Sequence, residues 1–144
     1  MHISMRFFFL LFALLAGLTA DAAASELVVI VSARSAAPML RNDQVAAIFL
    51  GQSAQFPDGV NVTAVDQLVG SSPRDEFYAR VASKSPALLK AYWSKLLFTG
   101  RGQPPREVAG NAAVKKLVAE TPGMIGYIDR SALDATVRPV LVLR

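Results

Sequence analysis

Residues 62–77 read VTAVDQLVGSSPRDEF and connect a short apolar strand to a helix through one glycine and two serines. The strand is predicted from Val62 to Asp66. Proline is favoured in the first turn of a helix, where its missing N–H leaves no hydrogen bond unmade, and a serine before it can accept a bond from a free backbone N–H. We therefore predict a helix from Pro73 to about Ala82, and with it the strand-to-helix step of an α/β fold.

The flanking sequence continues this alternation of strands and helices. Residues 26–32 (ELVVIVS) form a continuous apolar run, which is typical of a strand buried on both faces. Further helices are predicted from Asn42 or Asp43 to Leu50, over 86–97, and over 111–120 with Asn111 as its cap. In the helix over 86–97, pairs of leucine, tyrosine and tryptophan at helical spacing indicate core residues. Further strands are predicted over 123–129 and 137–143, the latter at a sheet edge because it contains Pro139. The segment between Thr99 and Gly110 is predicted to be an irregular loop.

The predicted order is strand, helix, strand, three helices, strand, strand. This order fits a three-layer α/β sandwich with a mostly parallel mixed sheet. The sequence contains no internal repeat and no linker that would divide it, so we expect one domain over residues 25–144.

Residues 1–24 have the pattern of a secretory signal peptide. A basic start with Arg6 precedes an apolar run from Phe7 to Leu18, and small residues at 20–24 offer a cleavage site. The alternative, an uncleaved anchor helix, is disfavoured because twelve residues at about 1.5 Å each reach roughly 18 Å, short of a hydrocarbon layer of ~30 Å. We expect a cleaved signal peptide and a periplasmic product.

Composition excludes several classes of function. The chain has 144 residues, a formal net charge of +4, no cysteine and a single histidine, His2, inside the predicted signal peptide. Thiol nucleophiles, disulfides, cysteine or histidine zinc sites and histidine-based catalysis are thereby excluded from the exported part. Lysines and arginines are scattered, which argues against nucleic acid as a partner. We expect no enzyme, metal or cofactor; Asp66 and Asp129 are interpreted as polar ends of strands.

Two loops could bind an anion. Gly70, Ser71 and Ser72 lie at the start of a helix, where free N–H groups, hydroxyls and the helix dipole favour negative charge, and Arg74 adds a cation. The alternative is that a serine only caps the helix. Arg101 and Arg106 lie in the second loop, and their guanidinium groups suit phosphate or carboxylate unless they are simply solvated.

Four segments resemble short exported proteins related to phosphate ABC transporter substrate-binding proteins, of the type 2 periplasmic-binding fold. The segments are IFLG (48–51), VDQLVGSSPRDEF (65–77), AYWSKLLFTGRGQPP (91–105) and GNAAVKKLVAETPGMIGYI (110–128). The resemblance implies a fold of one lobe and a protein that binds phosphate or a related oxyanion. It places Gly70, Ser71 and Ser72 on the family's ligand loop and implies an ABC transporter permease as a candidate partner. With Arg74 as a substitute for the family's arginine and Arg101 from the second loop, the candidate ligand residues are Gly70, Ser71, Ser72, Arg74 and Arg101.

The sequence departs from this family at the loop itself. Full-length receptors carry a Gly-Ser-Gly-Thr loop after an arginine, whereas here Ser72 replaces the second glycine, Pro73 replaces the threonine, and Gln67 or Asp66 replaces the arginine. Because such receptors hold phosphate between two lobes, three possibilities stay open: a homodimer that rebuilds a cleft, weak binding at one helix terminus, or a sensory or adaptor protein that contacts a membrane receptor through residues 99–110.

Overall fold

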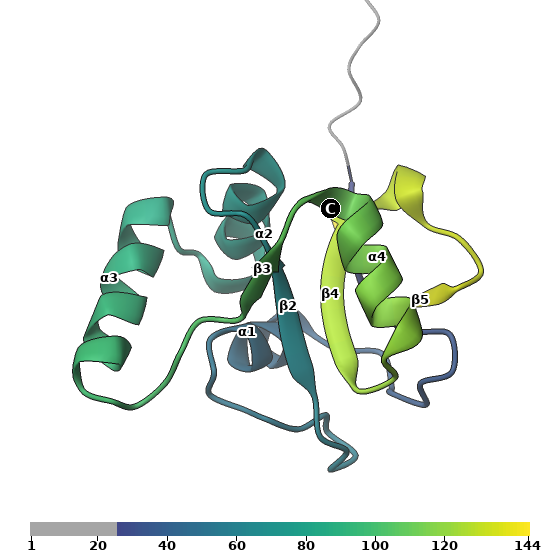
Figure 1. The fold of residues 1–144 in the computed structure, drawn as a ribbon, viewed down its shortest axis with the longest axis horizontal. Coiled ribbons are helices and arrows are strands. Elements are labelled where there is room, and N and C mark those ends of the chain that lie inside the picture. The colour runs from purple at the N-terminus through teal and green to yellow at the C-terminus, as the bar shows by residue number, and fades with distance from the viewer. Residues whose placement is uncertain (1–25) are drawn as a thin grey trace, which may run out of the picture.

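The computed structural model describes residues 26–144, so the predicted signal peptide lies outside the described residues. A five-stranded sheet is covered by helices on both faces (Figure 1). The strands are β1 (Leu27–Ser32), β2 (Thr63–Gln67), β3 (Arg106–Val108), β4 (Met124–Asp129) and β5 (Val137–Leu143). The helices are α1 (Asn42–Phe49), α2 (Ser72–Ala82), α3 (Pro86–Phe98), α4 (Gly110–Glu120) and the single 3-10 turn η1 (Arg130–Ala132).

The strand order is β3-β2-β4-β1-β5, and the sheet is mixed. β2 runs parallel to β3 and to β4, whereas β1 runs antiparallel to both β4 and β5. The predicted mixed α/β sandwich is confirmed, with fewer parallel pairs than expected because β1 inserts between the two C-terminal strands. β5 lies at an edge, as Pro139 indicated, and the register shifts beside that proline between Val29 and Ile30.

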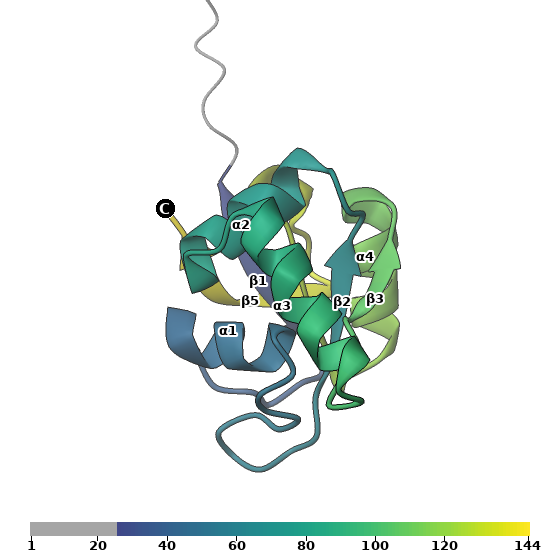
Figure 2. The same ribbon diagram turned by 90° about the vertical axis from the view of Figure 1, so that its left-hand side faces the viewer.

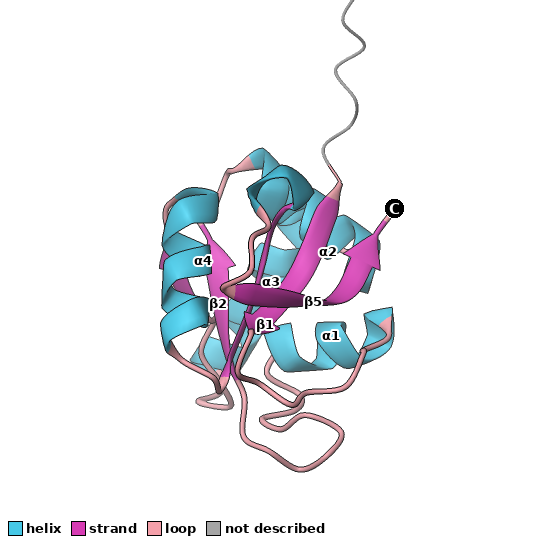
Figure 3. Cartoon of the chain, turned by 90° about the vertical axis from the view of Figure 1, so that its right-hand side faces the viewer, coloured by secondary structure: helices cyan, strands magenta, loops and turns pink. Residues whose placement is uncertain are grey.

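β1 lies at the centre of the core, because its side chains point alternately into the two hydrophobic layers on either side of the sheet. Leu27, Val29 and Val31 pack in the layer that contains α1 and α2, and Val28 and Ile30 pack under α4. Figures 2 and 3 view the sheet from its β3 and β5 edges, with α4 on one side of it and α1 and α2 on the other. All six residues of β1 are buried, which confirms the prediction of a strand covered on both sides. No helix in residues 26–144 is long and apolar enough to cross a membrane.

α3 lies outermost on its side of the sheet (Figure 1) and buries fewer residues than predicted. Leu89 and Trp93 are buried, but Leu88 and Leu97 are more than half exposed and Phe98 is 94% exposed. The prediction that all the apolar pairs of α3 belong to the core is therefore wrong. Only one edge of the helix meets the domain, so the second leucine of a pair faces solvent.

Two predictions about residues 99–111 need correction. Residues 106–108 form a short strand that pairs with β2, with Asp66 opposite Glu107, so the segment is not an irregular loop throughout. A three-residue edge strand with two charged residues carries no hydrophobic alternation that sequence analysis could detect. Asn111 is the second residue of α4, and Ala109 occupies the cap position.

Candidate functional site

The loop that follows β2 ends at the N-terminus of α2. Gly70 adopts a φ of +86°, a conformation that glycine tolerates and other residues rarely adopt. The Ser71 N–H donates to Leu68 O, and the Asp75 N–H donates to Ser71 O, so α2 itself does not use the N–H groups of Ser72 and Arg74. Pro73 between them offers no donor. The helix start therefore presents two backbone donors on one turn.

Ser71 is the N-cap of α2, but its side chain makes no capping bond. Its Oγ atom is buried and has no hydrogen-bond partner among residues 26–144. A buried hydroxyl without a partner carries a desolvation cost, which an acceptor at the helix terminus would relieve. The simple alternative, that Ser71 serves as a capping side chain, is not what the structure contains.

Asp66 lies directly beneath this loop and is 1% exposed. Its Oδ1 accepts hydrogen bonds from the Gln67 N–H at 2.8 Å and from the Tyr127 hydroxyl, and its Oδ2 accepts one from the Tyr78 hydroxyl at 2.6 Å. The interpretation of Asp66 as a polar end of a strand is wrong, because the residue lies inside β2 and joins three elements. Asp129, by contrast, does lie at the end of β4, where its carboxylate accepts from the Ser131 N–H.

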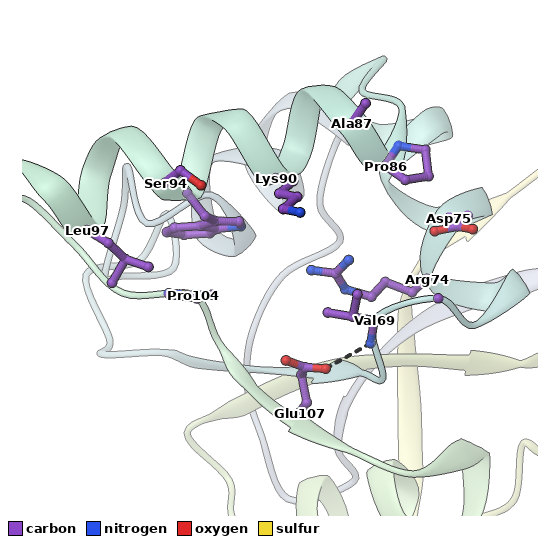
Figure 4. A pocket seen from close by; sticks show the side chains of 12 residues that line it. Val69, Arg74, Asp75, Pro86, Ala87, Lys90, Ser94, Leu97, Pro104 and Glu107 are labelled. Atoms are coloured by element: carbon purple, nitrogen blue, oxygen red, sulfur yellow. Dashed lines mark hydrogen bonds between the residues drawn. The ribbon is translucent and has the colours of Figure 1, made fainter.

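Arg74 extends from the first turn of α2 toward this carboxylate. Its Nε lies 3.4 Å from Asp66 Oδ2, and its guanidinium lies 5.3 Å from the centre of the Tyr78 ring. Arg74 is 7% exposed, yet its Nε makes no hydrogen bond to any residue that the structure describes. Figure 4 shows the end of the guanidinium directed into a cavity beside α2. Arg74 thus combines an ion pair on one side with free donors on the other.

Burial raises the pKa of Asp66 above its ordinary value, and hydrogen bonds from Tyr127 and Tyr78 and the charge of Arg74 only partly oppose this effect. Burial also raises the pKa of both phenols, with the Asp66 carboxylate adding to the shift. Both tyrosines therefore remain protonated and donate to Asp66. The carboxylate is a costly buried charge whose position depends on these partners.

The raised pKa of Asp66 predicts a pH dependence of stability. The folded state binds this proton more tightly than the unfolded state, so as pH falls from about 7 to about 4 the wild type should gain stability relative to an Asp66→Asn variant. Urea unfolding of both proteins across this range measures the difference in their free energies of unfolding. A difference that does not change with pH, or that changes in the opposite direction, contradicts the raised pKa.

Gln67 is one of the two residues, with Asp66, that stand in place of the arginine of the resembled family, and its side chain is hydrogen-bonded within the domain. Its Nε2 donates to Tyr127 O at 3.0 Å and to Asn111 Oδ1 at 3.3 Å. Asn111 Oδ1 also accepts from the Asp129 N–H at 3.1 Å. Gln67 and Asn111 thus connect β2, β4 and α4 and leave the role of a cation at the loop to Arg74.

A cavity of about 550 Å³ opens beside the first turn of α2, between α3 and β3. Arg74 and Lys90 point toward each other across it, and the Glu107 carboxylate accepts a hydrogen bond from the Val69 N–H at 2.8 Å (Figure 4). Its other walls are mainly apolar. The lining residues are Val69, Gly70, Arg74, Asp75, Pro86, Ala87, Lys90, Trp93, Ser94, Leu97, Pro104 and Glu107.

The structure brings four of the five candidate ligand residues together at one helix terminus: Gly70, Ser71, Ser72 and Arg74. Arg101 follows the C-terminal end of α3, is exposed and does not line the cavity. α3 has 13 residues, about 20 Å of helix, which separates Arg101 from Pro86 at the end of the cavity that adjoins Arg74. Within residues 26–144, no cluster of three acidic, histidine or cysteine residues could hold a metal ion.

Sequence analysis did not identify Tyr78, Tyr127, Lys90 or Trp93 as parts of this region, and it interpreted Asp66 as the polar end of a strand. Asp66 and Tyr127 are 61 residues apart in the chain, and only the pairing of β2 with β4 brings them within hydrogen-bond distance. The sequence contained one indication of the role of Asp66, namely that an acidic residue stands at the end of an apolar strand. That signal does not distinguish a buried anchor from a solvated end.

No family model matches the chain, and no curated protein matches it. Among solved structures, it resembles a phosphate ABC transporter substrate-binding protein with bound phosphate from Clostridium perfringens, with 23% identity and a TM-score of 0.63. It also resembles an ABC-type phosphate transport receptor from Vibrio cholerae (18% identity, TM-score 0.63) and PstS from Borrelia burgdorferi (15% identity, TM-score 0.59).

Each of these matches covers 81% of the chain and 44%, 45% and 46%, respectively, of the matched protein. The chain thus spans less than half the length of the proteins that it resembles. The matches confirm the predicted fold, one lobe of a periplasmic binding protein, and at these identities they show the fold alone.

Proposed function

We propose that the chain is an exported solute-binding protein that binds phosphate or a related small oxyanion at the N-terminus of α2. The observation that carries this proposal is the group of unused donors at that terminus. They are the backbone N–H groups of Ser72 and Arg74, the Ser71 hydroxyl and the guanidinium of Arg74. Donors of this kind, together with the helix dipole, favour an anion.

The same geometry indicates binding of moderate strength. Pro73 removes one backbone donor, Gln67 is engaged with Tyr127 and Asn111, and Asp66 offsets part of the charge of Arg74. A helix terminus open on one side also leaves water on the ligand, which weakens each electrostatic contact. High affinity would require a second surface, supplied by a homodimer or by a transporter permease.

A specific observation favours a second candidate function, that of a sensory or adaptor protein. Phe98, at the end of α3, is 94% exposed and precedes the segment 99–105 with exposed Arg101. A large aromatic side chain in solvent beside a cation is a common element of protein contacts. In this role the membrane receptor would contact the C-terminal end of α3.

Replacing both loop serines distinguishes the two functions. A Ser71→Ala, Ser72→Ala variant should bind phosphate at least about tenfold more weakly than the wild type, because it lacks a hydroxyl donor to the charged ligand. Calorimetric titration with phosphate and sulfate, at low and high salt, measures this loss. A Ser94→Ala variant on α3 is the control and should match the wild type for these ions.

If the folded wild-type protein binds neither phosphate nor sulfate, the proposed oxyanion site is contradicted. The sensory or adaptor function is then the remaining candidate. Equal binding by the wild type and the double variant would place the anion elsewhere.

A further inference from the structure

The cavity beside α2 has two unlike ends. One end meets the first turn of α2, with Gly70 and Arg74, and the other lies along α3 against Leu97 and Pro104 (Figure 4). Its volume of about 550 Å³ is far larger than an inorganic anion needs and falls in the range of sites for small organic ligands. A ligand that fills the cavity must therefore carry an apolar part.

Two buried donors of residues that line this cavity make no hydrogen bond. Trp93 is 5% exposed, and its Nε1 has no hydrogen-bond partner among residues 26–144. Arg74 Nε also makes no hydrogen bond within these residues. A buried tryptophan normally satisfies its N–H, since an unmade bond costs free energy. Arg74 Nε faces Asp66 Oδ2 at 3.4 Å, so Trp93 Nε1 is the donor that an acceptor atom of a ligand in the cavity would satisfy.

The charges around the cavity favour an oxyanion head near Arg74. Lys90 points toward Arg74 across the cavity, so two cations meet at this place (Figure 4). Asp75 and Glu107 also line the cavity, and Glu107 is held by the Val69 N–H. With Asp66 paired to Arg74, three acids offset the two cations, which favours a ligand with one negative charge over one with two.

We propose that the ligand is an organic oxyanion, a singly charged head joined to an apolar group about the size of a phenyl ring. The head lies between Arg74, Lys90 and the start of α2, with an oxygen toward Trp93 Nε1, and the apolar group lies against Leu97 and Pro104. This inference rests on the proposed oxyanion site, because Arg74 belongs to both, and it assigns the chemical class of the ligand.

Phenyl phosphate, inorganic phosphate and phenol test the proposal as three probes of the purified protein. At about pH 5.5, where a phosphate monoester carries close to one charge, phenyl phosphate should bind at least about tenfold more tightly than inorganic phosphate. It should also change the fluorescence of Trp93, which is the one tryptophan in the sequence. Phenol should not saturate the protein at the concentrations at which phenyl phosphate does, because phenol lacks the charged head.

Paired variants on α3 locate the binding. Ser94→Phe narrows the end of the cavity near Leu97 and should weaken phenyl phosphate at least about tenfold while inorganic phosphate binds as before; Ala91→Phe, outside the lining, is its control. Lys90→Gln should weaken phenyl phosphate, and the control Lys95→Gln should not. Circular dichroism of each variant verifies its fold.

Equal affinity for phenyl phosphate and inorganic phosphate overturns this inference and leaves the oxyanion site intact. Binding of phenol as tight as that of phenyl phosphate overturns it too, since the head would then contribute nothing. Absence of binding by both phosphates overturns the inference together with the proposed function.

Discussion

Replacing Asp66 with alanine is expected to lower the free energy of unfolding by about 3–5 kcal/mol, the largest effect of any single change at this site. The variant leaves Arg74 buried without its carboxylate and removes the acceptor for the Tyr78 and Tyr127 hydroxyls. Because β2, α2 and β4 all meet at this carboxylate, the loss concerns the whole domain and should appear as a shift of the urea midpoint.

Asp43→Ala is the matched control for this experiment. Asp43 also pairs with an arginine, Arg41, but both side chains are 71% exposed, so water replaces the lost contact and stability should change little. An Asp66→Ala protein as stable as the Asp43→Ala protein would show that the buried network does not hold the fold together.

Introducing the Gly-Ser-Gly-Thr loop of the resembled family is expected to strengthen phosphate binding at least about tenfold. The double variant Ser72→Gly, Pro73→Thr adds a backbone N–H at the start of α2 and exchanges the Ser72 hydroxyl for one at position 73, and a hydrogen bond to a charged ligand contributes at least about 1.5 kcal/mol. Calorimetric titration of the wild type and the variant with inorganic phosphate measures the ratio of their dissociation constants.

Pro86→Thr is the control for the change of proline to threonine. Pro86 likewise lies in the first turn of a helix, α3, but outside the Gly70–Arg74 segment, so inorganic phosphate should bind to this variant as to the wild type. Unchanged affinity in the Ser72→Gly, Pro73→Thr variant would contradict the assignment of the start of α2 as the anion site.

The elements predicted best were those whose signals are local. Val28 and Ile30 belong to an unbroken apolar run, and serine followed by proline at 72–73 and 85–86 marks two helix starts. The predicted bounds of β1, α2 and α3 are therefore close to the observed ones. β3 was missed because its pairing with β2 depends on a neighbour about 40 residues away in the chain. The exposure of Leu88 and Leu97 was missed for a related reason, since periodicity does not reveal how much of a helix meets the domain.

In the candidate site too, features that depend on local sequence could be predicted, and features that depend on contacts between distant segments could not. The anion-binding character of Gly70, Ser71 and Ser72 follows from their place before a helix, which sequence alone reveals. The buried role of Asp66 and the open donors of Arg74 and Trp93 follow from contacts between distant segments. Arg101 was chosen for its residue type and its loop, and the structure places it beyond the other end of α3.

The central claim is that an oxyanion binds at the start of α2, and amide chemical shifts test it most directly. Inorganic phosphate is titrated into the ¹⁵N-labelled protein, with chloride at equal ionic strength as the control. The account predicts saturable shifts that are largest at the N–H groups of Gly70, Ser72 and Arg74, because these amides lie at the helix terminus. Shifts centred on any other segment, or none beyond those of chloride, would contradict it.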